Sequence, residues 1–222
     1  FIGSAGAMLQ DDRTRKMFVR MAERADIHHS YSSLDPATML SQSSEPGDAF
    51  YRKSAFPSKS QRMILLERCA PLLLRRTLDR LALSRAEVAA ITHVVVTSFT
   101  GMYAPGLDFD IIDHLGLSPA VERTMIGFMG CYAAINALKL CRYIVRSEPS
   151  AKVLMVNLEL CTLHFQETQE LAQILAFLVF ADGCAASLTS AEAEGLALDS
   201  FHAVQTPNTR GAHYLAGARA GL

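Results

Sequence analysis

Two largely apolar runs, Ile91–Ser98 and Val153–Leu158, place the strongest constraint on how this chain of 222 residues folds. The first run contains Val94, Val95 and Val96 in succession. A run without regular polar alternation is typical of a strand that is buried on both faces, as in parallel sheets covered by helices. The two runs therefore predict interior strands of a layered α/β domain with a largely parallel sheet.

Helix signals lie between and around these strands. Ser58 followed by Gln61 predicts a capping box that opens a helix running to about Leu81, and Ser84 with Glu87 predicts a second one. We also expect helices over 107–115, 131–144 and 169–180, and strands over 123–128, 185–189 and 196–201. The helix over 131–144 is apolar nearly all round, which predicts a central, buried position.

The amino-terminal part has a different character. Charges interleaved with Met17, Met21 and Phe18 predict an amphipathic helix over 11–25, and the Ser- and Pro-rich stretch 32–57 predicts a long irregular segment. We expect one domain over 1–222, with an amino-terminal segment 1–57, an α/β core 58–204 and a truncated tail 205–222. Because residue 1 is Phe rather than Met, we expect the true start to lie upstream.

Composition excludes several classes of function. The formal net charge is −1 and the pI is near 6.7, so no nucleic-acid or anionic-membrane partner is expected. The longest apolar stretch near the end, 174–180, is far shorter than the ~18 residues of a membrane span.

The cysteines favour a free thiol over a crosslink. Five cysteines form an odd set with no C-x-x-C pair, which argues against a disulfide framework or a metal site and favours a reducing cytoplasm. Cys69 and Cys141 fall in the middle of predicted helices, and Cys184 follows a glycine at a strand start. We interpret these three as packing residues.

Cys131 is the candidate nucleophile because it falls where a strand passes through Gly130 into a helix. A helix start presents unpaired N–H groups and partial positive charge, which favour the thiolate, and the thiolate is the reactive form. The small side chains of Ala133 and Ala134 keep the space beside Cys131 narrow but open, so that a long thioester arm can approach. The alternative is an inert core cysteine, since free cysteines are commonly buried.

The stretch 91–188 resembles the type III polyketide synthases, the chalcone synthase-like family, in the amino-terminal half of their thiolase fold. Four segments carry the resemblance in the right order: Thr92–Ser98 followed by Gly101 and Pro105-Gly106; Arg123 through Gly130-Cys131; Val153–Thr162, which includes Glu159; and Phe180-Ala181-Asp182-Gly183-Cys184-Ala185-Ala186. Together these segments are specific, whereas each alone is weak.

The resemblance implies an acyltransferase without a bound cofactor, whose substrates are CoA thioesters. A starter acyl-CoA acylates Cys131, malonyl-CoA decarboxylates to an enolate, and the enolate attacks the thioester in a Claisen condensation. The resemblance also implies a homodimer. A second half-domain supplies the family's catalytic histidine and asparagine, and no residue of this chain is assigned to either role, so the chain is expected to lack efficient decarboxylation.

Other site residues follow from the same resemblance, position by position. Phe180 matches the gatekeeper between the CoA tunnel and the cavity, Glu159, Cys161 and His164 match cavity-lining positions, and Thr100 matches a small polar position near the cavity. Arg20 and Arg24 are the best CoA-binding candidates. The plainer alternatives are a core aromatic for Phe180, a satisfied histidine for His164 and a solvated helix face for the arginines. The small side chains of Cys161 and Ala104 favour a cavity for a longer acyl starter.

Two further alternatives stay open. A β-ketoacyl carrier-protein synthase III-like enzyme would use a carrier protein and usually has Ala before the cysteine, whereas Gly130 stands there. A non-catalytic, truncated dimerisation module is the second. A cysteine hydrolase would need a base near Cys131, and the sequence offers none.

Overall fold

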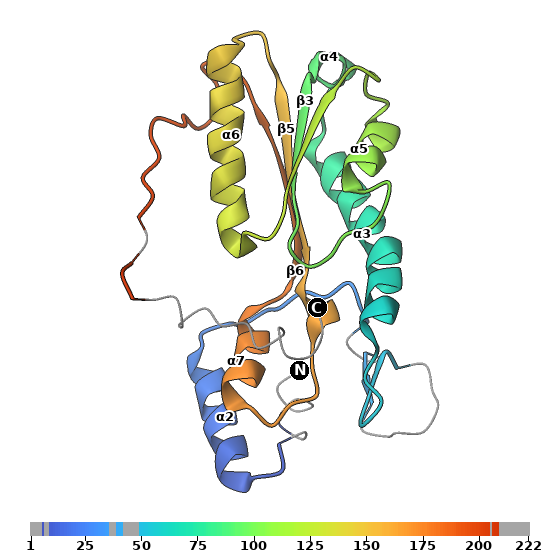
Figure 1. Ribbon diagram of the computed structural model, residues 1–222, viewed down its shortest axis with the longest axis vertical. Helices are drawn as coiled ribbons and strands as arrows, with labels where there is room; N and C mark the ends of the chain where they lie inside the picture. Colours follow the sequence, from blue (N-terminus) through green and yellow to red (C-terminus); the bar gives the residue numbers. More distant parts are fainter. Residues whose placement is uncertain (1–5, 7–8, 36–38, 42–48, 205, 209–222) are drawn as a thin grey trace. The chain divides into compact units, whose positions relative to one another are not determined.

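The computed structural model describes residues 6, 9–35, 39–41, 49–204 and 206–208 (Figure 1). The chain divides into two units, Phe1–Ala191 and Glu192–Leu222. The first unit holds every helix and strand considered below. The predicted tail 205–222 falls outside the described residues except for 206–208.

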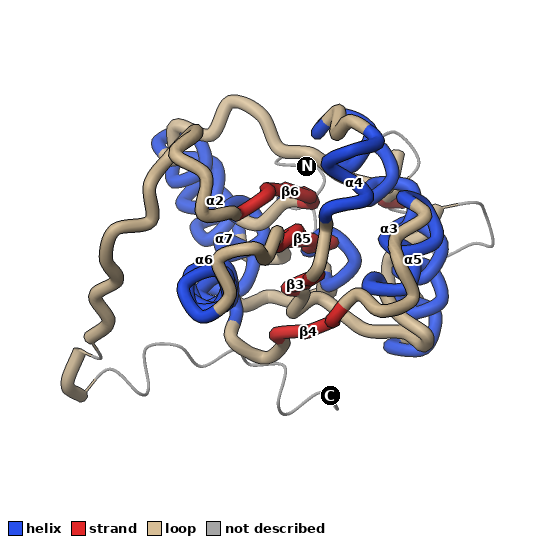
Figure 2. Tube along the Cα trace, turned by 90° about the horizontal axis from the view of Figure 1, so that it is seen from above, coloured by secondary structure: helices blue, strands red, loops and turns tan. Residues whose placement is uncertain are grey.

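A four-stranded sheet in the order β4-β3-β5-β6 forms the centre of the first unit (Figure 2). Strands β3 (His93–Thr97), β4 (Glu122–Ile126) and β5 (Val153–Leu160) are parallel, and β6 (Asp182–Thr189) pairs antiparallel with β5. His93 pairs with Val153, which sets the register of the two buried runs. The prediction of a mixed, largely parallel sheet is confirmed.

Helices cover both faces of this sheet. Figures 1 and 2 show α6 (Ala133–Ser147) on one face, and α3 (Lys59–Leu81) and α5 (Leu107–Leu115) on the other. Val94 and Val96 pack on the α3 side, whereas Val95 packs against α6. Alternate residues of a strand point to opposite faces, so an uninterrupted apolar run is what two helical layers require.

The structure contains both capping boxes that the sequence predicts. Ser58 caps α3 and Ser84 caps α4 (Arg85–Ala90), and in both helices the side chain at the third position returns a bond to the cap backbone. Helix α5 ends at Gly116, whose φ of 65° lies in the left-handed region that favours glycine. These boundaries confirm the predictions from local sequence.

A second apolar cluster joins the amino-terminal helix α2 (Asp12–Arg24) to α7 (Leu171–Val179). Phe18 and Ala22 form the buried stripe of α2, whereas Met17 and Met21 are exposed. The amphipathic helix is therefore confirmed, but its apolar face is shifted by one residue from Met17 and Met21. The irregular segment 32–57 contains only two short paired strands, β1 (Leu40–Ser41) and β2 (Tyr51–Arg52), among its described residues.

Two predictions are wrong. Helix α6 is not buried all round: Ala133, Ala137, Cys141 and Val145 face the sheet, while Ile135 and Tyr143 are exposed, because the sheet is the only layer of the described residues that packs against this helix. Residues 196–201 form no strand, and Leu196 is 96% exposed. The apolar residues of this stretch do not alternate with polar ones as they do in a half-buried strand.

Candidate active site

Cys131 lies between the end of β4 and the start of α6, within the short 3₁₀ helix η1 (Gly130–Tyr132). Gly130 has a φ of 54°, so the tight turn uses the left-handed conformation that glycine adopts without strain. The cysteine side chain is exposed. Cys131 is therefore a free thiol at a helix start that reagents can reach, which excludes a sealed position in the core. Its chemical role stays a prediction.

Glu159 ties the ends of β3 and β5 together. Its carboxylate accepts the backbone N–H of Phe99 at 3.0 and 3.1 Å and that of Thr100 at 2.9 Å. In return, the Thr100 hydroxyl oxygen accepts the N–H of Leu160 at 2.9 Å. A carboxylate in a largely buried strand needs hydrogen-bond partners, and the structure supplies two backbone amides. Thr100, which is buried, uses its side chain to hold this junction.

Cys161 opens the short helix η2 (Cys161–His164), which directly follows β5. Burial, and after it the charge of Glu159, raises the pKa of the Cys161 thiol to about 12. The charge of Asp182 acts in the same direction. Cys161 is therefore a neutral thiol at physiological pH. It follows β5, which ends at the same edge of the parallel sheet as β4, the strand that leads to Cys131.

His164 ends η2, and its ring Nε2 bonds to the carbonyl oxygen of Thr100. Burial lowers the pKa of His164, the bond to Thr100 opposes this effect, and the charge of Arg62 adds to it. A neutral ring must carry its proton on Nε2 in order to donate to a carbonyl, which leaves Nδ1 as an acceptor. The Nε2 atom of His164 therefore has a hydrogen-bond partner within the chain, as expected if this histidine has a structural role.

Phe180 directly follows α7 and is 38% exposed, so it is neither a fully buried core aromatic nor a free surface residue. Arg20 and Arg24 lie one turn apart on α2, both exposed to solvent. Their position permits contact with an anionic ligand and equally fits a solvated face. The gatekeeper and CoA-binding roles stay predictions.

Asp182 lies in one of the four segments that carry the family resemblance, but the sequence assigned it no role. The structure places its buried carboxylate at the centre of a hydrogen-bond network. Its carboxylate accepts the Thr162 N–H at 2.8 Å, the Thr162 hydroxyl at 2.7 Å and the Ser33 N–H at 2.6 Å. Arg62 was also missed. It occupies the same helical stripe as Leu66 and Ala70, where a charged residue among buried apolar ones was the available signal.

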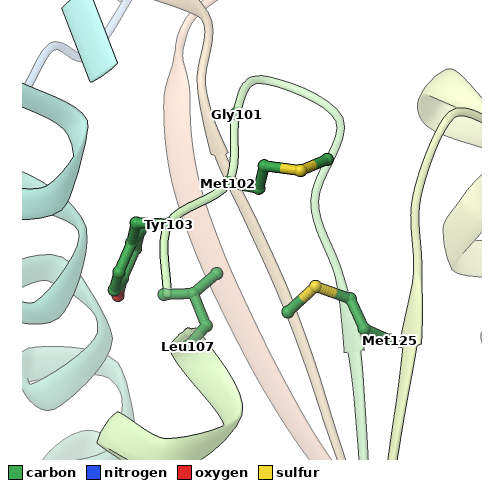
Figure 3. Close-up of a pocket in the computed structure, with 5 residues that line it drawn as sticks. All are labelled: Gly101, Met102, Tyr103, Leu107 and Met125. Atoms are coloured by element: carbon green, nitrogen blue, oxygen red, sulfur yellow. The ribbon is translucent and has the colours of Figure 1, made fainter. Parts of the chain in front are cut away.

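A small hollow lies between β4 and the loop that follows β3 (Figure 3). Gly101, Met102, Tyr103, Leu107 and Met125 line it. The Tyr103 hydroxyl is bound to the Asp110 carboxylate, so the hollow offers mainly apolar contacts. A side chain at Gly101 would come within 2.5 Å of Leu66, so glycine is required there for close packing. Neither Cys131 nor Cys161 borders the hollow.

The described part of the chain contains no group of three or more His, Cys, Asp or Glu side chains arranged to hold a metal ion. Within the same residues, no helix combines the length and apolar character needed to span a bilayer.

Comparison with solved structures defines the class. The type III polyketide synthase domain of Steely1, a type I/III hybrid from Dictyostelium, superposes with a TM-score of 0.72 at 26% identity, covering 86% of this chain and 51% of that chain. The 1,3,6,8-tetrahydroxynaphthalene synthase of Streptomyces coelicolor A3(2) gives a TM-score of 0.74 at 21% identity, covering 94% and 57%, which bears on the fold alone. The fold is thiolase-like, of the kind found in type III polyketide synthases.

Sequence relatives then identify the family. Residues 9–193 match the model of the chalcone and stilbene synthases, N-terminal domain. The chain is also 31% identical over 183 residues to the "Alpha-pyrone synthesis polyketide synthase-like Pks18" of Mycobacterium tuberculosis H37Rv, an alignment covering 81% of this chain and 46% of the relative. The chain belongs to the chalcone and stilbene synthase family, as the resemblance predicted. It spans about half the length of this relative.

Proposed function

We propose that this chain supplies the acyl-accepting half of a type III polyketide synthase. The Cys131 thiolate attacks the carbonyl carbon of an acyl-CoA thioester, and the CoA thiolate leaves. Malonyl-CoA then loses CO₂, and the resulting enolate carbon attacks the Cys131 thioester, which forms the new C–C bond and releases the cysteine thiolate. Membership of the family and the position of Cys131 support this proposal.

One observation carries the assignment: Cys131 is exposed at a helix start after β4, and Glu159, Cys161 and His164 lie at the end of β5, which is the same edge of the parallel sheet. The other four cysteines are buried or half-buried. An acyl-CoA therefore meets one accessible sulfur, and the surrounding polar groups are held by hydrogen bonds within the chain. Preorganised groups of this kind are what a site for developing charge requires.

The condensation step depends on groups outside the matched segment. The family's histidine and asparagine belong to a second half-domain, and we propose that they act on malonyl-CoA from there. The exposed apolar residues Ile135, Tyr143 and Phe128 fit a surface that another half-domain or a second copy covers. Homodimer formation, and CoA phosphate binding by Arg20 and Arg24, belong to the same proposal.

Intact-mass spectrometry tests the acyl transfer. The chain is incubated with acetyl-CoA or dodecanoyl-CoA, alongside Cys131→Ala and the matched control Cys69→Ala. We expect one thioester adduct in the parent and in Cys69→Ala, and none in Cys131→Ala. With malonyl-CoA added, this chain by itself is expected to release CO₂ no faster than Cys131→Ala. An adduct that persists in Cys131→Ala removes Cys131 from the role, and a parent without any adduct refutes acyl transfer by this chain.

A further inference from the structure

Residues 161–165 have a backbone held by side chains that come from distant parts of the chain. They are called here the cavity turn, because the family resemblance places Cys161 and His164 at cavity-lining positions. The Tyr51 hydroxyl donates to the carbonyl oxygen of Thr162 at 2.6 Å. One terminal nitrogen of Arg62 donates to the carbonyl oxygens of Leu163 at 2.6 Å and Phe165 at 2.8 Å. These partners are separated by about a hundred residues in sequence, so the shape of the turn depends on the tertiary fold.

Arg62 is only 4% exposed, and its Nε also donates to the carbonyl oxygen of Pro57 at 3.0 Å. Among the described residues, no carboxylate lies within 4.0 Å of its guanidinium group. The charge is therefore solvated by backbone carbonyls and by the Tyr51 ring and hydroxyl. A buried charge is costly unless its hydrogen bonds are made, and Arg remains charged because its pKa is too high for it to lose a proton. An apolar side chain could fill this space but would leave the carbonyl oxygens of Pro57, Leu163 and Phe165 without this donor, so packing alone does not account for the arginine.

The two carbonyls that Arg62 bridges lie on either side of His164, so the guanidinium group fixes the backbone at that residue. The His164 ring is held separately on the Thr100 carbonyl. Cys161 stands at the other end of the cavity turn, directly after β5, and β5 ends at the same edge of the parallel sheet as β4, which leads to Cys131. The cavity turn thus determines where two polar groups stand in relation to the acyl-accepting sulfur.

We propose that Arg62 is a positioning residue: by bridging the Leu163 and Phe165 carbonyls it holds Cys161 and His164 in place, and thereby limits which acyl chains reach Cys131. The selection of acyl chains rests on the proposed function, whereas the positioning of the cavity turn does not. Lysine cannot replace the arginine fully, because an ammonium group lacks the planar fork that reaches two carbonyls and Pro57 together.

Thiol labelling tests the positioning directly. The folded chain and the variants Arg62→Lys and Arg62→Met are treated with iodoacetamide at pH 8, and labelling of Cys161 and Cys184 is followed by peptide mass spectrometry. Cys184 lies in β6 and is half-buried like Cys161, so it reports general opening of the fold. We expect the Cys161 rate to rise about tenfold in both variants while the Cys184 rate changes less than about twofold. The control Arg75→Lys, at an exposed position of α3, should change neither labelling rate.

Equal acceleration of both cysteines would show that Arg62 supports the whole fold, and no acceleration would show that the turn does not need it; either result overturns the proposal. Tyr51→Phe, which loses the bond to Thr162 but keeps Arg62, should give a smaller, local rise at Cys161.

Acyl selection has its own measurement. The ratio of Cys131 acylation rates with dodecanoyl-CoA and acetyl-CoA should change about tenfold in Arg62→Lys and stay constant in Arg75→Lys. A constant ratio in Arg62→Lys refutes the selective role, because a general loss of stability lowers both rates together. If the parent chain is never acylated, the proposed function fails, and the labelling result still decides whether Arg62 positions the turn.

Discussion

Replacing Asp182 by asparagine tests how much the hydrogen-bond network between β6 and the cavity turn contributes to stability. Asp182 is 8% exposed, and its two oxygens accept three hydrogen bonds, two from Thr162 and one from the Ser33 N–H. Asparagine has almost the same shape but only one acceptor oxygen. If that oxygen keeps the Ser33 N–H and the Thr162 hydroxyl, the amide NH₂ must face the Thr162 N–H, so two donors oppose each other.

The expected loss of stability follows from this geometry. A hydrogen bond to a charged group contributes about 1.5–3 kcal/mol, and a buried N–H left without an acceptor costs about 1–3 kcal/mol. These effects overlap because they concern the same donor, so we expect Asp182→Asn to lower the free energy of unfolding by about 2–4 kcal/mol. The matched control Asp79→Asn alters an exposed pair with His114 and should cost less than about 1 kcal/mol.

Urea denaturation followed by far-ultraviolet circular dichroism measures both variants against the parent at pH 7. A loss below about 1 kcal/mol for Asp182→Asn, with an unchanged denaturant slope, would refute the reasoning, because it would mean that the three bonds contribute no more than an exposed pair. An equal loss in Asp79→Asn would refute it as well, since the position of the carboxylate would then be irrelevant.

Three further predictions concern stability. Ser84→Ala removes the side-chain acceptor of the Glu87 N–H at the start of α4. Urea denaturation should show a free energy of unfolding lower by about 1 kcal/mol, and an unchanged value would show that the cap contributes nothing. Ala137→Leu adds bulk where α6 meets the sheet and should cost about 1–3 kcal/mol; an unchanged midpoint would contradict the close packing of that interface. The raised pKa of Cys161 means that the unfolded state loses its thiol proton first, so stability present below pH 9 should decline as the pH rises toward about 12. Cys161→Ser should make that decline shallower when the free energy of unfolding is measured across this range, and an identical slope would contradict the assigned burial.

Much of the fold follows from interactions between residues close together in the sequence. The caps at Ser58 and Ser84 bond to amides three residues away, and Gly116 ends α5 through its own backbone conformation. The apolar runs of β3 and β5 and the turn at Gly130 are likewise readable from consecutive residues. For the same reason the helix-start position of Cys131 was predictable from the sequence.

The tertiary structure alone decided which faces are covered and which polar groups meet. Helix α6 has apolar residues around its circumference, yet only the side against the sheet is buried, because burial depends on what packs there. The stretch 196–201 was predicted to be a strand but forms none, since local composition does not determine which segments pair in a sheet. Arg62, Tyr51 and Asp182 reach the cavity turn across large separations in sequence. Local sequence sets a residue's own backbone preference, whereas the partners of a buried charge are fixed only when distant segments pack together.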